Sequence, residues 1–247
     1  MQKRLPAAFA LAAALWAAPI AAGAAPLSDS QKKEFEQLIR DYLLRHPEIL
    51  REMSEELQRR DRLDAEQALQ AALKASRQEL LASPSSPAGG AADGDVTLVT
   101  FFDYQSPAAK ATEPHLAAAL QADGRVRVVY KELPLLGPAS LVAAKAALAA
   151  RKQGKYEPLH RALLASREKL DNDTLQALAK GAGLDLGRLK ADMESPEIDR
   201  EIAANRALAE RLAILQTPWF LVSGTVLSGP VLLNETFLDL FRQGRSG

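Results

Sequence analysis

The chain has 247 residues, 47% of them hydrophobic and 25% charged, which suits one large folded domain with a smaller module. Lys and Arg together number 31, as do Asp and Glu, so the chain offers no broad basic field for a phosphate backbone. Nucleic acid is therefore not an expected partner. The absence of cysteine excludes disulfides, thiolate metal sites and redox-active thiols.

Residues 1–24 have the pattern of a signal peptide. Lys3 and Arg4 precede an uncharged, Ala- and Leu-rich run, and Ala22-Gly23-Ala24 supplies small residues for cleavage. A membrane anchor is the alternative, but the apolar run is short and rich in alanine for a spanning helix. We expect an exported protein with no membrane contact after cleavage.

Residues 25–82 are predicted to form an N-terminal helical module. Ser28 and Gln31 have the spacing of a capping box, and His46-Pro47 should end the first helix. The apolar residues of this module recur at helical spacing as a narrow stripe: Phe35, Leu38, Ile39, Tyr42, Ile49, Leu50, Met53 and Leu57. Such a stripe favours a homo-oligomer formed through residues 28–82; the alternative is a helix folded back on the main domain.

Residues 83–94 are rich in Ser, Pro, Gly and Ala and are predicted to be a linker. The apolar run 96–102 then predicts a buried strand, Ser106-Pro107 opens a helix, and residues 126–132 predict a second strand. A strand, a helix and a strand at this spacing form a unit whose strands are parallel.

Residues 138–214 are predicted to be helical in several pieces. Two short strands follow around the turn Ser223-Gly224, and Asn234 should cap a closing helix. The order β-α-β, helical block, β-β-α describes an α/β thioredoxin fold over residues 95–247 with a helical insertion at 138–214.

Four separated motifs carry a family resemblance. The run 96–110, VTLVTFFDYQSPAAK, resembles the active-site strand and helix start of DsbA-like proteins, and residues 130–134 and 216–218 resemble their second strand and cis-proline loop. Residues 41–44 and 46–48 resemble the N-terminal module of the ScsC, or suppressor of copper sensitivity, branch. The resemblance implies a periplasmic protein with the fold of a thiol-disulfide oxidoreductase.

The active-site motif departs from that family at three positions. Ser106 and Ala109 stand where the family has its two cysteines, and Thr100 stands where it usually has a buried glutamate. Thiol–disulfide exchange needs a thiolate that attacks sulfur, so neither serine nor alanine can perform it. The additional loss of the acid favours a natural redox-dead relative; an engineered cysteine-free variant is the alternative.

Other chemistry has little support in the sequence. A serine nucleophile at Ser106 needs an adjacent base, but His115 lies at least two turns along the helix, and nothing local ties His46 or His160 to the site. We interpret Ser106 as a helix cap before Pro107. The three His and three Met are scattered, so we expect no metal and no cofactor.

Two acidic residues near the motif receive structural interpretations. Asp103 is expected to be a solvated strand end, and Glu113 a helix-surface charge rather than the partner of an acid/base pair.

The Thr217-Pro218 pair is retained, and we expect its peptide bond to be cis, as in the family. The backbone before this proline can pair with an extended peptide. We therefore expect a peptide-binding site formed by five residues: Tyr104, Ser106, Pro107, Thr217 and Pro218.

The leading hypothesis is a redox-inactive, chaperone-like periplasmic protein that binds unfolded or partner polypeptides and is not an enzyme. The rival is a thiol-disulfide oxidoreductase or isomerase of the ScsC type, present here as a cysteine-free variant. A purely structural oligomer, in which the N-terminal helices are the functional part, is the third hypothesis.

Overall fold

The computed structural model describes residues 27–246, so the expected signal peptide lies outside the described residues. The chain divides into two compact units, with the boundary between Arg60 and Asp61. Among the described residues, no helix combines the length and apolar character needed to span a bilayer.

The N-terminal unit consists of α1 (Asp29–Arg45) and the first part of α2 (Glu48–Ala75). The predicted capping box is present, because the Gln31 N–H donates to the Ser28 side chain and the Gln31 side chain accepts from the Ser28 N–H. The helix ends at Arg45, with His46 as its C-cap directly before Pro47, so the predicted break is present. Two aromatic rings, those of Tyr42 and His46, lie 4.6 Å apart at this break.

The second unit is built on a five-stranded sheet in the order β1-β3-β2-β4-β5. Its strands are β1 (Ala88–Gly90), β2 (Val96–Phe102), β3 (Val126–Glu132), β4 (Trp219–Val222) and β5 (Thr225–Ser228). The β2 and β3 strands are parallel, as predicted, and β4 runs antiparallel to β2. β1 lies inside the stretch expected to be a linker and pairs with β3, so part of that stretch belongs to the sheet.

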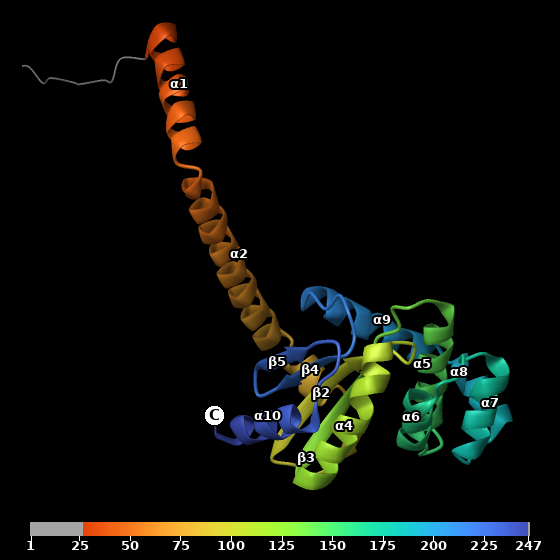
Figure 1. Ribbon diagram of the computed structural model, residues 1–247. Helices are drawn as coiled ribbons and strands as arrows, with labels where there is room; N and C mark the ends of the chain where they lie inside the picture. Colours follow the sequence, from red (N-terminus) through yellow and green to blue (C-terminus); the bar gives the residue numbers. More distant parts are fainter. Residues whose placement is uncertain (1–26, 247) are drawn as a thin grey trace, which may run out of the picture. The chain divides into compact units, whose positions relative to one another are not determined.

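Helices cover both faces of this sheet (Figure 1). The helices of this unit after α2 are α3 (Arg77–Ala82), α4 (Pro107–Asp123), α5 (Pro138–Arg151), α6 (Tyr156–Ala165), α7 (Asn172–Gly181), α8 (Leu186–Met193), α9 (Pro196–Arg211) and α10 (Asn234–Ser246). Of these, α7 and α8 pack against α5 and α6. The helices α5 to α9 fill the segment predicted to be a helical insertion, and the Ser223-Gly224 turn joins β4 to β5 as predicted.

Side chains alternate along a strand, so the residues of β2 pack into two separate hydrophobic cores, one on each face of the sheet. Leu98 and Phe102 pack with α4, α5, α6 and α10, whereas Val99 and Phe101 pack with α9, α3 and the end of α2. The end of β2 is therefore fixed from both sides where it leads into residues 103–106.

Candidate functional site

Ser106 caps α4 and also ties this helix to the loop before β4. Its Oγ accepts a hydrogen bond from the Ala109 N–H at 3.2 Å, which satisfies a backbone donor at the helix start. The same hydroxyl donates to the Thr217 carbonyl oxygen at 2.8 Å. The Thr217–Pro218 peptide bond is cis, as predicted. The structure therefore brings together Ser106, Pro107, Thr217 and Pro218, four of the five expected site residues.

Asp103 is buried, with only 2% of its surface exposed, so the expectation of a solvated strand end is wrong. Its carboxylate accepts hydrogen bonds from the backbone N–H groups of Gln105, Leu135 and Leu136 at 2.7 to 2.9 Å. Three backbone donors compensate for the loss of water around a buried carboxylate. Asp103 thereby fixes the loop after β3 beside the loop that leads into α4.

Tyr104, the fifth expected site residue, points into the interior and is 1% exposed. Its hydroxyl donates to Glu132 Oε1 at 2.9 Å and lies 3.0 Å from His160 Nδ1. Tyr156 donates to the same Glu132 oxygen at 2.9 Å. Tyr104 therefore anchors the loop before Ser106 to the interior, and its side chain does not line the surface that a polypeptide would contact.

Burial governs the protonation of this polar cluster. It raises the pKa of Glu132 well above its usual range, although the hydrogen bonds from Tyr156 and Tyr104 oppose the rise. Burial also lowers the pKa of His160 to about 3, so its ring is neutral near pH 7. Glu132 Oε2 has no hydrogen-bond partner among the described residues. A protonated Glu132 removes the cost of an incompletely paired buried charge.

A small cavity lies behind Ser106, between α4, α6 and the sheet. Its volume is about 10 Å³, room for about one water molecule, and Thr100, Ala109, Glu113, His160 and Pro218 are among its lining residues. The two positions where the family resemblance implies a cysteine and a glutamate, Ala109 and Thr100, thus face one space.

Glu113 is a half-buried carboxyl in this lining, so its interpretation as a helix-surface charge is wrong. It lies one turn after Ala109 on α4, and both face the cavity. Burial is the largest influence on its pKa and raises it to about 7; Arg161 opposes this rise and Glu157 adds to it.

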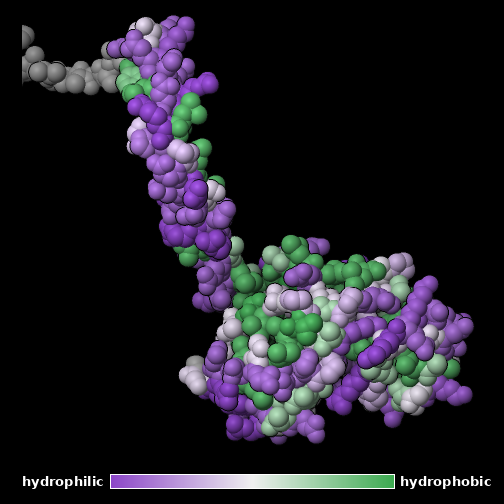
Figure 2. All heavy atoms as spheres, viewed as in Figure 1, coloured by the Kyte–Doolittle hydropathy of each residue, from purple (hydrophilic) through white to green (hydrophobic). Residues whose placement is uncertain are grey.

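Exposed apolar side chains gather around the contact between Ser106 and Thr217. Within residues 61–246, the large hydrophobic side chains that are strongly exposed, apart from Leu63 on α2, are Leu135, Leu136, Val142, Leu215, Val231 and Leu233. We call these six residues the apolar rim. In Figure 2 hydrophobic residues gather on the part of the domain that carries, in Figure 1, the start of α4 and strands β4 and β5.

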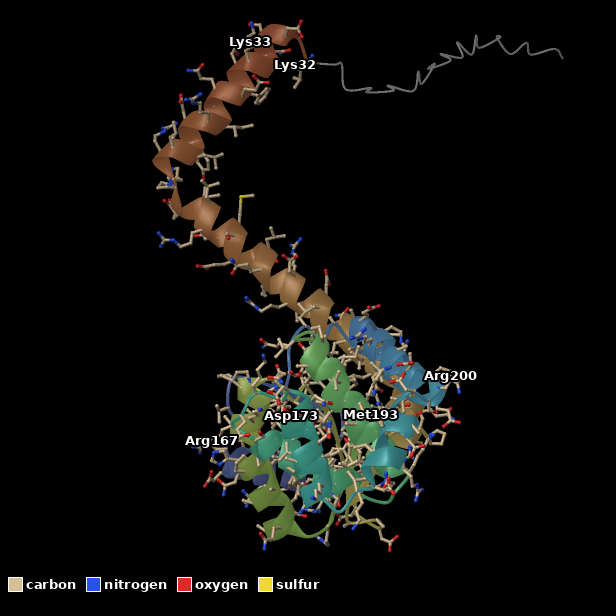
Figure 3. All side chains as sticks on the ribbon, turned by 90° about the vertical axis from the view of Figure 1, so that its right-hand side faces the viewer. Lys32, Lys33, Arg167, Asp173, Met193 and Arg200 are labelled. Carbon is tan, nitrogen blue, oxygen red and sulfur yellow. The ribbon has the colours of Figure 1, made fainter. Side chains whose placement is uncertain are left out.

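Hydrogen bonds hold the segments of the rim close to the site. Asp103 binds the backbone of Leu135 and Leu136, and Leu215 lies two residues before Thr217. The Leu232 N–H donates to Thr112 Oγ1 on α4, which brings the third segment to the same helix. The later helices of the insertion differ, because charged side chains project from them near the labelled Asp173 and Arg200 (Figure 3).

The sequence reasoning missed the residues that reach the site from other elements. It found nothing to connect His160 with the site, yet this residue contacts Tyr104 and lines the cavity. Glu132 was assigned only as a strand end, and Tyr156 was not considered. The polar Glu132 at the end of an apolar strand was the one available signal, because a buried carboxyl requires partners from elsewhere in the fold.

Comparisons with known proteins place these features in a family context. The family described as "DSBA-like thioredoxin domain" matches residues 97–237, and that described as "Copper resistance protein ScsC N-terminal domain" matches residues 31–62. The thioredoxin fold and the ScsC-like N-terminal segment predicted from the motifs are therefore confirmed.

Two solved structures illustrate the likeness. A thioredoxin-like oxidoreductase from Silicibacter pomeroyi is 38% identical, with a TM-score of 0.67 over 69% of this chain and 98% of that chain. ScsC of Proteus mirabilis in a transitional conformation is 28% identical, with a TM-score of 0.65 over 89% of this chain and 97% of that chain.

A curated relative is similar to part of this chain and is a much longer protein. The Na⁺/H⁺ antiporter NhaA 3 of Salinispora tropica is 32% identical over 143 residues, which are 57% of this chain and 22% of that protein. The chain thus spans about a fifth of the length of the curated relatives that it matches.

Proposed function

Because this chain belongs to the DSBA-like thioredoxin domain family but contains no cysteine, we propose that it is a redox-inactive, chaperone-like member that binds unfolded or extended polypeptides. Ser106 and Ala109 cannot form the mixed disulfide through which such proteins exchange thiols. The surface around these residues would then bind polypeptides without exchanging disulfides with them.

The apolar rim is the observation that carries this proposal. Five of its six members belong to three segments that lie close to the contact between Ser106 and Thr217, and the sixth, Val142, lies on α5. Leu215 is the most exposed of them, at 88%. An exposed apolar patch bordered by polar surface is typical of a protein-binding site, because covering it removes apolar area from water.

The backbone at Thr217 supplies the polar part of such a site. Its carbonyl oxygen accepts one hydrogen bond, from Ser106, and a carbonyl can accept a second. An extended polypeptide would pair with this backbone as an added strand, while its apolar side chains contact the rim. Recognition through backbone groups and apolar contacts suits unfolded clients of varied sequence.

The first test measures whether the protein suppresses aggregation of a reduced, unfolding client protein. The variant Leu215→Asp places a charge in the rim at a fully solvated position, so it should leave the fold intact and weaken suppression by about tenfold, the cost of losing one well-packed apolar contact. The light-scattering signal at substoichiometric protein would report the loss.

The control is Gln176→Asp, which adds the same charge at an exposed position of α7. It should suppress aggregation as well as the unaltered protein does. If the unaltered protein shows no suppression, or if both variants lose it equally, polypeptide binding at the rim is refuted and the structural-oligomer hypothesis gains support.

Two further features complete the proposal. The stripe on α1, with Phe35, Leu38, Ile39 and Tyr42 each at least 50% exposed, would bind the same stripe of a second copy and form a homo-oligomer.

The signal pattern of residues 1–24 and the periplasmic setting of the DsbA-like family support a periplasmic location.

The rival oxidoreductase is tested by restoring both cysteines in the double variant Ser106→Cys and Ala109→Cys. The N-terminus of α4 would stabilise a thiolate at position 106. Insulin reduction by this variant, compared with the single variant Ser106→Cys, reports whether the scaffold still supports exchange. Strong activity would favour a recently active parent, and none would favour a long-established binding protein.

A further inference from the structure

Glu113 places a carboxyl group directly beneath the proposed polypeptide site. It shares the cavity lining with Ala109 and Pro218, which lie next to the helix start and to Thr217. The other residues of this lining are aromatic, aliphatic or uncharged polar, apart from the buried His160. Glu113 is the one carboxyl among the lining residues, and neither lysine nor arginine lines the cavity to pair with it.

The charged and titratable groups that face Glu113 come from α6 and β3. On α6, Glu157 forms an ion pair with Arg161 at 3.7 Å and also accepts the Tyr130 hydroxyl at 3.1 Å. His160 is neutral near pH 7 because it is buried. From β2 and the cis-proline segment the neighbours are uncharged. Arg161 also acts on Glu113 and opposes the rise in its pKa, but the effect of burial is larger.

We propose that Glu113 sets the charge preference of the polypeptide site: when ionised, it disfavours acidic segments and favours basic ones. This inference rests on the proposed function, because it concerns the polypeptide that covers Pro218. Such a polypeptide displaces water from the mouth of the cavity. A charge on its side chains then interacts with the Glu113 carboxylate through a medium less polar than water, which strengthens attraction and repulsion alike.

The preference should depend on pH with a defined sign. The raised pKa of Glu113, about 7, means that the carboxyl is mostly neutral at pH 5.5 and mostly ionised at pH 8.5. Discrimination between basic and acidic segments should therefore be strong at the higher pH and weak at the lower one. A single charge at a separation on the order of 10 Å in a partly polar medium changes affinity by about five- to tenfold.

The experiment compares two capped, fluorescently labelled peptides that share one extended apolar core. One peptide carries a lysine on each side of the core and the other carries a glutamate on each side. Fluorescence anisotropy gives the ratio of their affinities at pH 5.5 and pH 8.5. We expect the full-length protein to favour the lysine peptide about five- to tenfold more at pH 8.5 than at pH 5.5.

The variant Glu113→Gln should bind both peptides but lose most of this change in ratio. The matched control, Glu194→Gln, removes an exposed carboxyl at the end of α8 and should keep it. Far-UV circular dichroism checks that each variant folds, and the pH dependence of the unaltered protein tests the inference without any variant.

The outcomes separate the two proposals. If neither peptide binds at either pH, the proposed function fails and this inference fails with it. If both peptides bind but the ratio is the same at both pH values, or if Glu113→Gln keeps the full change, only the role of Glu113 is overturned.

Discussion

The two units of this chain use apolar side chains in opposite ways. In β2 every residue except Thr97 is buried, whereas α1 has no buried residue and exposes Ile39 by 57%. The domain from Asp61 onward therefore contains its own cores. The apolar stripe of α1 contributes no comparable burial, so substitutions in the two units should have different consequences.

The largest effect on stability should come from the core of the domain. Phe101 is fully buried and packs edge-on against Trp219 at a ring separation of 5.5 Å. Phe101→Ala should lower the free energy of unfolding by about 3–5 kcal/mol, because it removes apolar contacts and leaves a cavity. Urea unfolding followed by far-UV circular dichroism measures the loss.

The control is Phe35→Ala, the same change at a residue of α1 that is 50% exposed. It should change the free energy of unfolding of the domain by less than about 0.5 kcal/mol. Equal losses for the two variants would mean that the apolar residues of α1 support the domain after all.

A second prediction concerns pH and Glu113. Its pKa is raised in the folded state to about 7, so the folded protein binds more protons than the unfolded chain between about pH 4.5 and 7. This group alone makes stability fall as pH rises through that window. Glu113→Gln should remove the fall and stabilise the protein above pH 7 by an amount on the order of 2–3 kcal/mol.

His160 acts in the opposite direction and must be separated from Glu113. Its pKa is lowered to about 3, so stability is lost as pH falls from about 6.5 toward 3. Unfolding midpoints measured at several pH values for the unaltered protein and for Glu113→Gln isolate the carboxyl, since His160 is common to both. Parallel pH profiles would show that Glu113 is solvated and would weaken its assignment to the cavity.

These interior groups show where prediction from the sequence reached its limit. The fold, the capping box, the cis bond at Pro218 and the cap at Ser106 were predictable because each depends on local pattern or on a contiguous motif. The surroundings of Asp103 and Glu113 were not, because they depend on segments about 30 to 100 residues away in sequence. Burial of a charged residue is decided by packing between elements, and an alternating or helical pattern does not encode it.

A smaller effect is expected where the closing helix is fastened to the domain. Arg245 on α10 binds Asp123 through two nitrogens at 2.5 and 2.8 Å and Asp95 through a third at 2.8 Å. Arg245→Ala should lower the free energy of unfolding by about 1 kcal/mol. The contact is partly exposed, but two nitrogens of the guanidinium bind the two oxygens of the Asp123 carboxylate. Arg242, which pairs with Asp239 at the surface, provides the control: Arg242→Ala should cost close to nothing, and equal costs would contradict the special role of Arg245.

The smallest effect on the domain, and the sharpest contrast between the units, should come from the stripe itself. Leu38 is 58% exposed and lies among Phe35, Ile39 and Tyr42 on one face of α1, whereas Leu44 is 70% exposed and lies off that face. Leu38→Asp should weaken self-association by about tenfold or more, because it buries a charge in the proposed interface between copies. Sedimentation velocity over a concentration series measures this loss.

Leu44→Asp, the same chemical change off the stripe, should leave the sedimentation coefficient and its concentration dependence unaltered. Both variants should keep the urea midpoint of the domain, because α1 has no residue in either core. Loss of self-association in both variants would point to general damage of α1 rather than to an interface. A monomer at all concentrations before any substitution would remove the second copy as the partner of the stripe, and the exposed side chains of α1 would then require a different protein to cover them.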